Sequence, residues 1–271
     1  MFSATYQLLE QESLIVRSCL CTGLTGIRNA NLHDKGRYYT AFFQLAIGIE
    51  RMAKLALILD CMAQNNLCAP GQQAVRTYGH DLKTLFATVQ ATAQARGYTL
   101  RSIFTLSQLS TDVLEFLSEF ATGMRYANLD ALASGNAQRE PLHEWNQILQ
   151  GVVKSKVPAK TKRRVTQQST AVANALQDMS LVMASDLDGK PLSIATALSN
   201  PALLDAAAKQ LIWELLSLLA PLRDFIVESG HSAERTTAAQ TQSIAHIPNM
   251  SEFFDFIWLD RGNALRKKRW P

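Results

Sequence analysis

The stretch YYTAFFQLAIGIERMAKLALILDCMAQ, residues 38–64, decides the fold class, because it is apolar almost all the way round at helical spacing. The charged residues Glu50, Arg51 and Lys54 cluster within one turn, and Glu50 precedes Lys54 in the favourable i,i+4 order. A helix that is apolar on nearly every side lies at the centre of a bundle. The sequence therefore predicts that residues 38–64 form the core helix of an all-α protein, a helical bundle with a C-terminal helical extension.

An amphipathic helix is expected before this core helix. Ser3 can cap a helix over about residues 4–22, and Gly23 and Gly26 are expected to weaken its end. No convincing strand pattern, internal repeat or long heptad pattern is present. The next predicted helix follows Asp112 and Glu115, which have a spacing like that of a capping box, and buries Val113, Leu117, Phe120 and Met124.

A long helix is expected near the C-terminus. Ser199 or Asn200 is its predicted cap, with Pro201 at the favoured first position and Gly230 as the stop. Pro221 should kink this helix. Its predicted buried stripe is Leu204, Leu211, Leu215, Leu218, Leu222 and Ile226.

Composition limits the class of protein. With 271 residues, 47% hydrophobic residues and a net charge of +4, the chain is neither disordered nor short of a core. The apolar run 211–222 is interrupted and too short to span a bilayer, so no membrane partner is expected. Buried thiols in a reducing compartment are the expected state of Cys19, Cys21, Cys61 and Cys68, which predicts a cytoplasmic protein without a metal site or cofactor.

The stretch KSKVPAKTKRR, residues 154–164, has six basic residues and no acid. A solvated connector of this kind would separate a helical unit at 1–150 from a C-terminal helical unit at 165–271, although the second unit could equally pack on the first as one domain. Ten of the 27 basic residues lie in this stretch and in residues 266–269, so the remainder of the chain has a net charge of −6. The predicted nucleic-acid contacts are Lys154, Lys156, Lys160, Lys162, Arg163, Arg164, Arg266, Lys267, Lys268 and Arg269.

Three local motifs together resemble the HEPN superfamily, a group of helical nucleotide-binding or ribonuclease modules. They are GRYYTAFFQLAIGIERMAKLALIL from residue 36, YGHDLKTL at 78–85 and GMRYANLDAL at 123–132. The resemblance covers about residues 5–132. It implies a pocket inside the bundle, with Glu50 partnered by Arg125, and it implies a homodimer. The pocket residues that it suggests are Glu50, Lys54, His80, Asp81, Arg125 and Tyr126. For His80 and Asp81 a helix start, capped by Asp81, is favoured over a ligand-binding role.

Ribonuclease members of that superfamily carry an Arg and a His at short spacing, and here Arg28 and His33 have the spacing R-N-x-x-x-H. A His can move the proton of a ribose 2′-OH while an Arg stabilises charge on the phosphate, without a metal ion. In those enzymes the motif usually opens a later helix, where this chain has Arg125 followed by Asp130. Residues 28–34 also have the composition expected of a polar loop between two helices.

Three functions are therefore expected as alternatives. The first is a bacterial HEPN-like binding protein, with a protein, a nucleotide or a nucleic acid as its partner, in a toxin–antitoxin or phage-defence system. The second is a metal-independent endoribonuclease that uses Arg28 and His33. The third is a helical scaffold whose basic segments contact nucleic acid, with RNA as a possible partner.

Overall fold

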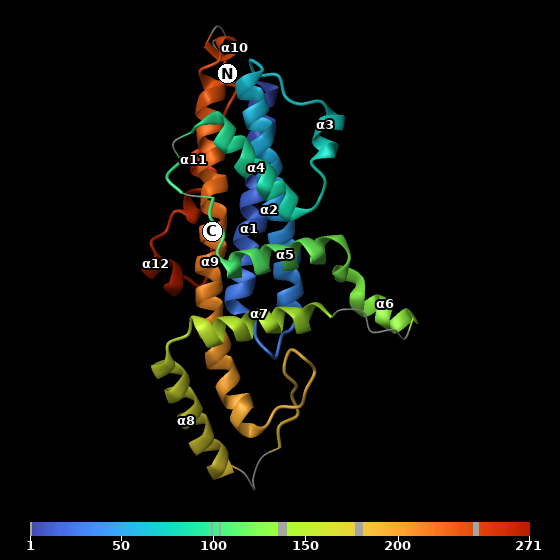
Figure 1. The fold of residues 1–271 in the computed structure, drawn as a ribbon, viewed down its shortest axis with the longest axis vertical. Helices are drawn as coiled ribbons and strands as arrows, with labels where there is room; N and C mark the ends of the chain where they lie inside the picture. The colour runs from blue at the N-terminus through green and yellow to red at the C-terminus, as the bar shows by residue number, and fades with distance from the viewer. Residues whose placement is uncertain (1, 99, 103, 135–139, 177–180, 241–243) are drawn as a thin grey trace.

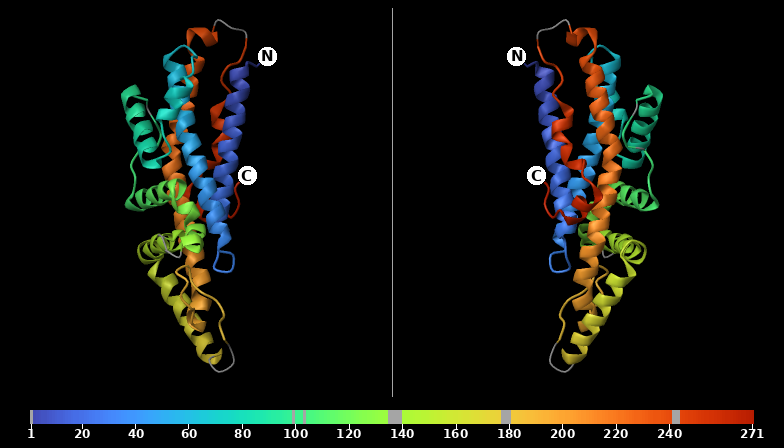
Figure 2. Two further views of the ribbon diagram at one scale, coloured as in Figure 1. Left: turned by 90° about the vertical axis from the view of Figure 1, so that its right-hand side faces the viewer. Right: turned by 90° about the vertical axis from the view of Figure 1, so that its left-hand side faces the viewer.

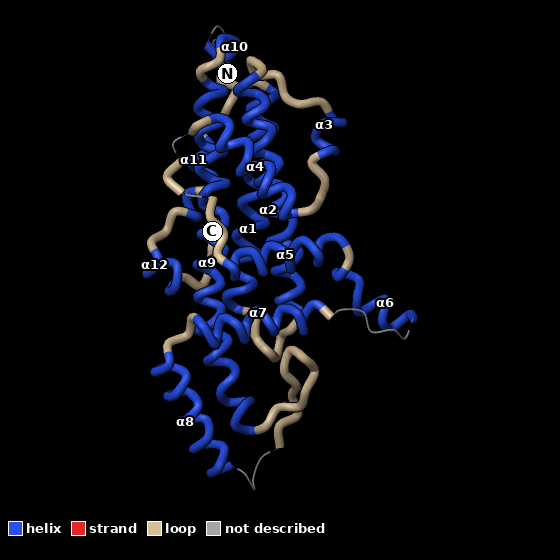
Figure 3. The backbone as a smooth tube through the Cα atoms, in the orientation of Figure 1, coloured by secondary structure: helices blue, strands red, loops and turns tan. Residues whose placement is uncertain are grey.

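The computed structural model describes residues 1–271 except 1, 99, 103, 135–139, 177–180 and 241–243. In this part of the chain all regular structure is helical (Figure 3), with only isolated β-bridges, so the all-α prediction is confirmed. The helices are α1 (Ala4–Asn29), α2 (Gly36–Gln64), α3 (Gln72–Thr77), α4 (Leu82–Arg96), α5 (Gln108–Thr122), η1 (Met124–Tyr126), α6 (Ala127–Ser134), α7 (Pro141–Ser155), α8 (Ala159–Leu176), α9 (Ile194–Glu234), α10 (Thr237–Gln240), α11 (Met250–Phe253), η2 (Asp255–Ile257) and α12 (Arg261–Arg266).

Three long helices form the centre of the molecule. Helices α1 and α2 make a hairpin, and the 41-residue α9 runs along both of them (Figure 1). Helix α2 contacts α1, α9, α4 and α5, and its side chains Phe42, Leu45, Met52 and Leu59 have no exposed surface. Most apolar residues of α2 are thus buried against a neighbour, with Phe43 and Ile47 exposed on its outer face, and the predicted core helix is confirmed.

Gly23 and Gly26 do not end the first helix, so that part of the prediction is wrong. Ser3 caps α1 as expected, accepting a hydrogen bond from the Tyr6 amide, but the helix continues to Asn29. A Cβ atom on Gly23 would lie 2.6 Å from Leu45 Cγ, and one on Gly26 would lie 2.8 Å from Ala41 Cβ. These glycines therefore allow α1 and α2 to approach closely, and this packing offsets their low helix propensity.

Two other predicted helix starts are also wrong. Helix α5 is capped by Ser107, which places Asp112 and Glu115 inside the helix. Helix α9 is capped by Ser193, so Pro201 lies inside it and its first turns pack against α8. Its predicted apolar stripe is buried as expected, and burial continues past Gly230 to Ala233. The helix also continues past Gly230, which packs against Met250, and it contains Pro221 without ending there.

A second layer of helices covers one face of this core. Helices α4, α5, α7 and α8 lie on the same side of α1, α2 and α9 in the views of Figure 2. The stretch 154–164 forms the end of α7 and the start of α8 rather than an irregular connector, and most of its residues are exposed. Both helices pack on α9, and α9 shares one hydrophobic core with α1 and α2.

The C-terminal segment packs against the helical core. Phe254, Phe256 and Ile257 are buried, so they dock this segment on the core. The Trp270 amide donates a hydrogen bond to Thr25 Oγ1 at 3.0 Å, and its side chain is buried. No helix in the described part of the chain is long and apolar enough to cross a membrane.

Candidate functional site

A cavity of about 350 Å³ lies where the outer face of α2 meets the segment before α4 and the end of α5. Three of the residues that the sequence pointed to, Glu50, His80 and Arg125, line this one cavity although 75 residues separate the first from the last. The other lining residues are mainly apolar: Phe43, Ala46, Ile47, Phe120, Ala121 and Thr122.

Glu50 is the charged centre of this site. Lys54 Nζ donates a hydrogen bond to Glu50 Oε1 at 2.8 Å, and His80 Nδ1 lies 2.9 Å from the same oxygen. The Glu50 side chain is only 20% exposed, whereas His80 is 76% exposed. Lys54 thus neutralises a largely buried carboxylate, and His80 is the group of the cluster that solvent and ligands reach.

Asp81 belongs to the helix start and does not line the cavity. Its Oδ1 accepts a hydrogen bond from the Thr84 amide at 2.7 Å, and its Oδ2 accepts one from Ser118 Oγ at 2.8 Å. The hydrogen bonds with Thr84 and Ser118 hold the pKa of the Asp81 carboxyl below its ordinary value of 3.8, against the smaller opposing effect of burial. The interpretation of Asp81 as a helix cap is confirmed.

Arg125 contacts its neighbour Tyr126 rather than Glu50. Its guanidinium lies 5.0 Å from the centre of the Tyr126 ring, a cation–π contact. In the described part of the chain no ion pair joins Arg125 to Glu50, so the expected direct pairing of these two residues is wrong. The reason is local: Lys54 lies one turn away from Glu50 on α2, and His80 lies at the start of α4.

Arg28 and His33 are not brought together in one cavity. Arg28 is buried and donates from Nη1 to Asp205 Oδ1 at 2.6 Å, while His33 is exposed in the loop between α1 and α2. Asn31 Oδ1 accepts from the amides of His33 and Asp34, which is the turn chemistry of a polar interhelical loop. The small cavity that Arg28 lines does not include His33. The endoribonuclease interpretation therefore stays a prediction without a site in the single chain.

The ten predicted basic contact residues fall into two groups. Lys156 forms an ion pair with Glu214, and Lys162 Nζ donates to the carbonyl of Lys154 at the end of α7. Lys267 is half-buried beside α12. The exposed members are Lys154, Lys156, Lys160, Arg163, Arg164, Arg266, Lys268 and Arg269.

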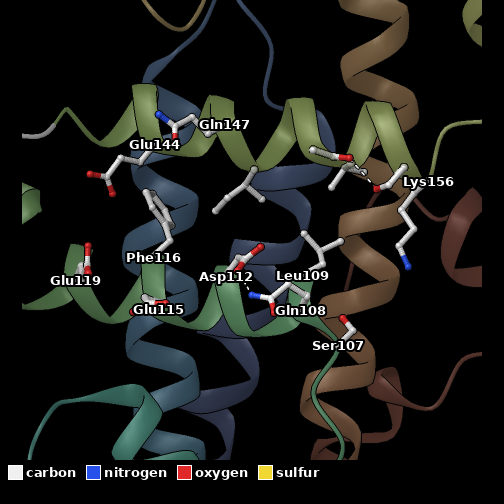
Figure 4. A pocket seen from close by; sticks show the side chains of 14 residues that line it. Ser107, Gln108, Leu109, Asp112, Glu115, Phe116, Glu119, Glu144, Gln147 and Lys156 are labelled. Carbon is white, nitrogen blue, oxygen red and sulfur yellow. Dashed lines mark hydrogen bonds between the residues drawn. The ribbon is translucent and has the colours of Figure 1, made fainter.

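The sequence did not point to a groove of about 610 Å³ between α5 and α7. Figure 4 shows Phe116 extending from α5 toward α7 above a row of acidic side chains. Asp112, Glu115 and Glu119 follow the i,i+3,i+7 spacing of one helix face. This spacing could have indicated the acidic row, but Asp112 and Glu115 were interpreted as the start of a helix. Asp60 was missed as well: it is buried, and Arg96 binds both of its carboxylate oxygens at 2.7 and 2.8 Å.

Comparison with known proteins gives no match: no family model, no curated protein and no solved structure is significantly similar to this chain. Support for a function therefore comes from the arrangement of the residues themselves.

Proposed function

We propose that this chain is a HEPN-like binding protein and that the cavity lined by Glu50, His80 and Arg125 binds a nucleotide. The observation that carries the proposal is the combination of an aromatic floor, an arginine without a carboxylate partner in the described part of the chain, and a hydrogen-bonding carboxylate in one cavity. Pockets of this size that are mostly apolar, with a few convergent polar groups, are the usual sites of small-ligand binding.

The apolar part of the cavity suits a base. Phe43 is 37% exposed, and its ring lies 4.9 Å from that of Phe120 in an edge-to-face arrangement. Ile47 is 43% exposed one turn further along α2. An exposed aromatic and aliphatic floor of this kind stabilises a stacked planar ring, because both surfaces lose contact with water.

The polar part suits the rest of a nucleotide. Arg125 can donate two parallel hydrogen bonds to a phosphate, which is the geometry that guanidinium favours. Glu50 uses Oε1 for both Lys54 and His80, so Oε2 is open to accept a hydrogen bond from a base amino group. His80 uses Nδ1 for Glu50, and its Nε2 is a second group for the ligand.

The test is isothermal titration calorimetry of the full chain with AMP, GMP, CMP and UMP. We expect at least one to bind, and Arg125→Ala to weaken its binding at least about tenfold, because a charge-assisted hydrogen-bond pair is lost. Arg235→Ala is the matched control, since Arg235 is also exposed but lies at the end of α9, outside the cavity. Absence of binding by all four nucleotides, or equal binding by Arg125→Ala, would contradict the proposal.

The proposal includes a homodimer in the cytoplasm, in the toxin–antitoxin or phage-defence setting that the resemblance implies. In support of self-association, the η1–α6 arm, whose Arg125 lines the cavity, projects from the helical core (Figure 1). Its residues Tyr126, Leu129 and Leu132 are 52%, 63% and 85% exposed. The four free cysteines are consistent with a reducing compartment. Light scattering after size-exclusion chromatography is the test: Leu129→Ser with Leu132→Ser should convert a dimer to a monomer.

A further inference from the structure

A second cavity, of about 270 Å³, lies on the other side of the molecule from the α6 arm, between α9, the segment that follows α4, and α11. The Ser102 amide joins two of its walls by donating a hydrogen bond to Asp224 Oδ2 at 2.8 Å. The cavity is lined by side chains of both charges, chiefly Arg101, Arg223, Asp224, Glu228 and His231. None of these residues belongs to the site proposed above.

The inner wall of this cavity is a buried ion pair. Arg223 and Asp224 are 8% and 4% exposed, and Arg223 Nη1 donates to Asp224 Oδ1 at 2.9 Å. Asp224 is fully used, because its second oxygen accepts from Ser102. Arg223 is not, because its buried Nε has no hydrogen-bond partner in the described part of the chain. An unmatched buried donor is destabilising, so the guanidinium of Arg223 lacks a full set of acceptors at the wall of this cavity.

One indole ring holds two guanidinium groups on this wall. The guanidinium carbon of Arg101 lies 4.4 Å from the centre of the Trp258 ring, and that of Arg223 lies 4.7 Å from the same centre. Two cations on one ring repel each other, and Asp224 compensates only Arg223. Arg101 has no carboxylate partner among the residues that the structure describes. The pair of guanidiniums is thus arranged to bind an added carboxylate.

A carboxylate that lines the same cavity also has no partner in the described part of the chain. Glu228 is half-buried, lies on α9 one turn beyond Asp224, and forms neither a hydrogen bond nor an ion pair within the described part of the chain. Glu228 and Arg101 thus line one small cavity without contacting each other. Opposite charges that are held apart across a cavity are complementary to a ligand that carries both charges.

We propose that this cavity binds a free α-amino acid. The carboxylate of the ligand accepts hydrogen bonds from Arg101 and Arg223, and its ammonium group donates to Glu228. The volume equals the space of about nine water molecules, which is enough for an amino acid of small or medium size. Trp258, which is 48% exposed beside both guanidiniums, reports the binding by its fluorescence.

The experiment measures Trp fluorescence and thermal unfolding of the full chain with each of the twenty common amino acids at millimolar concentration. Acetate and methylamine serve as probes with one charge only. At least one amino acid should raise the unfolding temperature and change the fluorescence, and Trp258→Phe should abolish the fluorescence change. Glu228→Gln and Arg101→Gln should each weaken binding at least about tenfold, because each removes one charged hydrogen-bond partner.

Glu234→Gln is the matched control, since Glu234 lies on the same helix but does not line this cavity. Both binding variants replace side chains on the cavity surface, so circular dichroism should match that of the unchanged chain. Three results would overturn the proposal: no response to any amino acid, equal binding by acetate, or unchanged binding by both variants. Equal binding by acetate would show a site for a simple carboxylate that does not use Glu228.

Discussion

Arg28 and Asp205 join the last turn of α1 to α9 through a hydrogen bond of 2.6 Å, and the two partners differ greatly in exposure. The Arg28 side chain is 2% exposed, whereas that of Asp205 is 44% exposed and also binds Lys209 at 2.7 Å. The buried cation depends on this one carboxylate for its charge compensation. The pair therefore fixes α9 on the α1–α2 hairpin. Arg28, the arginine of the expected catalytic motif, thus has a structural role.

Replacing Asp205 with Ala should lower the free energy of unfolding by about 3 kcal/mol, because it leaves a buried guanidinium without a counter-charge. Asp34→Ala is the matched control: the Asp34–Arg37 ion pair is also 2.6 Å long, but both of its side chains are more than half exposed. That change should cost at most about 1 kcal/mol. Urea denaturation of both variants measures the difference, and equal losses would show that burial of Arg28 does not matter.

Replacing glycine with alanine should change the free energy of unfolding in opposite directions at two positions, one at the contact between α1 and α2 and one in α7. Gly23→Ala adds a Cβ only 2.6 Å from Leu45 Cγ and 3.0 Å from its backbone nitrogen, so we expect a loss of about 1–3 kcal/mol. Gly151→Ala, inside α7, has no atom within 4 Å of the new Cβ and should gain up to about 1 kcal/mol from helix propensity. Thermal unfolding compares them. A stabilised Gly23→Ala variant would mean that the two helices can separate without loss.

Residues 38–64 predicted the fold class correctly because their apolar pattern depends on helix geometry alone. The errors share one cause. Gly23 and Pro201 were predicted to lie at helix ends because of their low helix propensity. Each lies instead inside a helix that packs against another helix, and this packing outweighs a propensity cost of about 1 to 3 kcal/mol. Nothing in the local sequence states which helix face will be packed. The stretch 154–164 is mostly helical for the same reason, because Val157 within it and Val165 directly after it are buried.

Parts of the candidate site could be predicted and parts could not. Glu50 was identified because a carboxylate in so apolar a helix needs a partner, and Lys54 one turn away supplies it. The second partner of Glu50, His80, could not be predicted, because its position depends on how the segment before α4 packs beside α2. The pairing of Arg101 and Arg223 on Trp258 joins three distant segments of the chain, and no local spacing encodes it.

Asp81 gives a prediction about pH. Its pKa is lower in the folded state than in the unfolded chain, chiefly through the hydrogen bonds with Thr84, so its contribution to stability is present above about pH 4 and is lost as the pH falls through the folded pKa. Asp81→Ala should lose about 1 kcal/mol near neutral pH, as for other helix caps, and less near pH 3. Denaturation at several pH values tests this. Asp112→Ala, which removes a carboxylate from inside α5, serves as the control and should show little change.

The first turns of α8 give the prediction for RNA. Lys160, Arg163 and Arg164 follow i,i+3,i+4 spacing, so they share one face of the helix, and all three are exposed. Lys162 differs because its ammonium group is bound to the Lys154 carbonyl. Any affinity for single-stranded RNA should therefore depend on these three cations and fall steeply with salt.

Replacing all three with Gln should reduce the slope of log affinity against log salt by about 2, since each phosphate contact contributes about 0.7. Arg76→Gln with Arg235→Gln removes exposed charge from other surfaces and should leave this slope nearly unchanged. Fluorescence anisotropy of a labelled RNA over a salt series measures both. The same samples, run on a gel with a chelator present, test the endoribonuclease interpretation: cleavage that is lost in His33→Ala would support it, and intact RNA would leave binding as the activity. An unchanged slope in the triple variant would exclude α8 as the RNA-contacting surface.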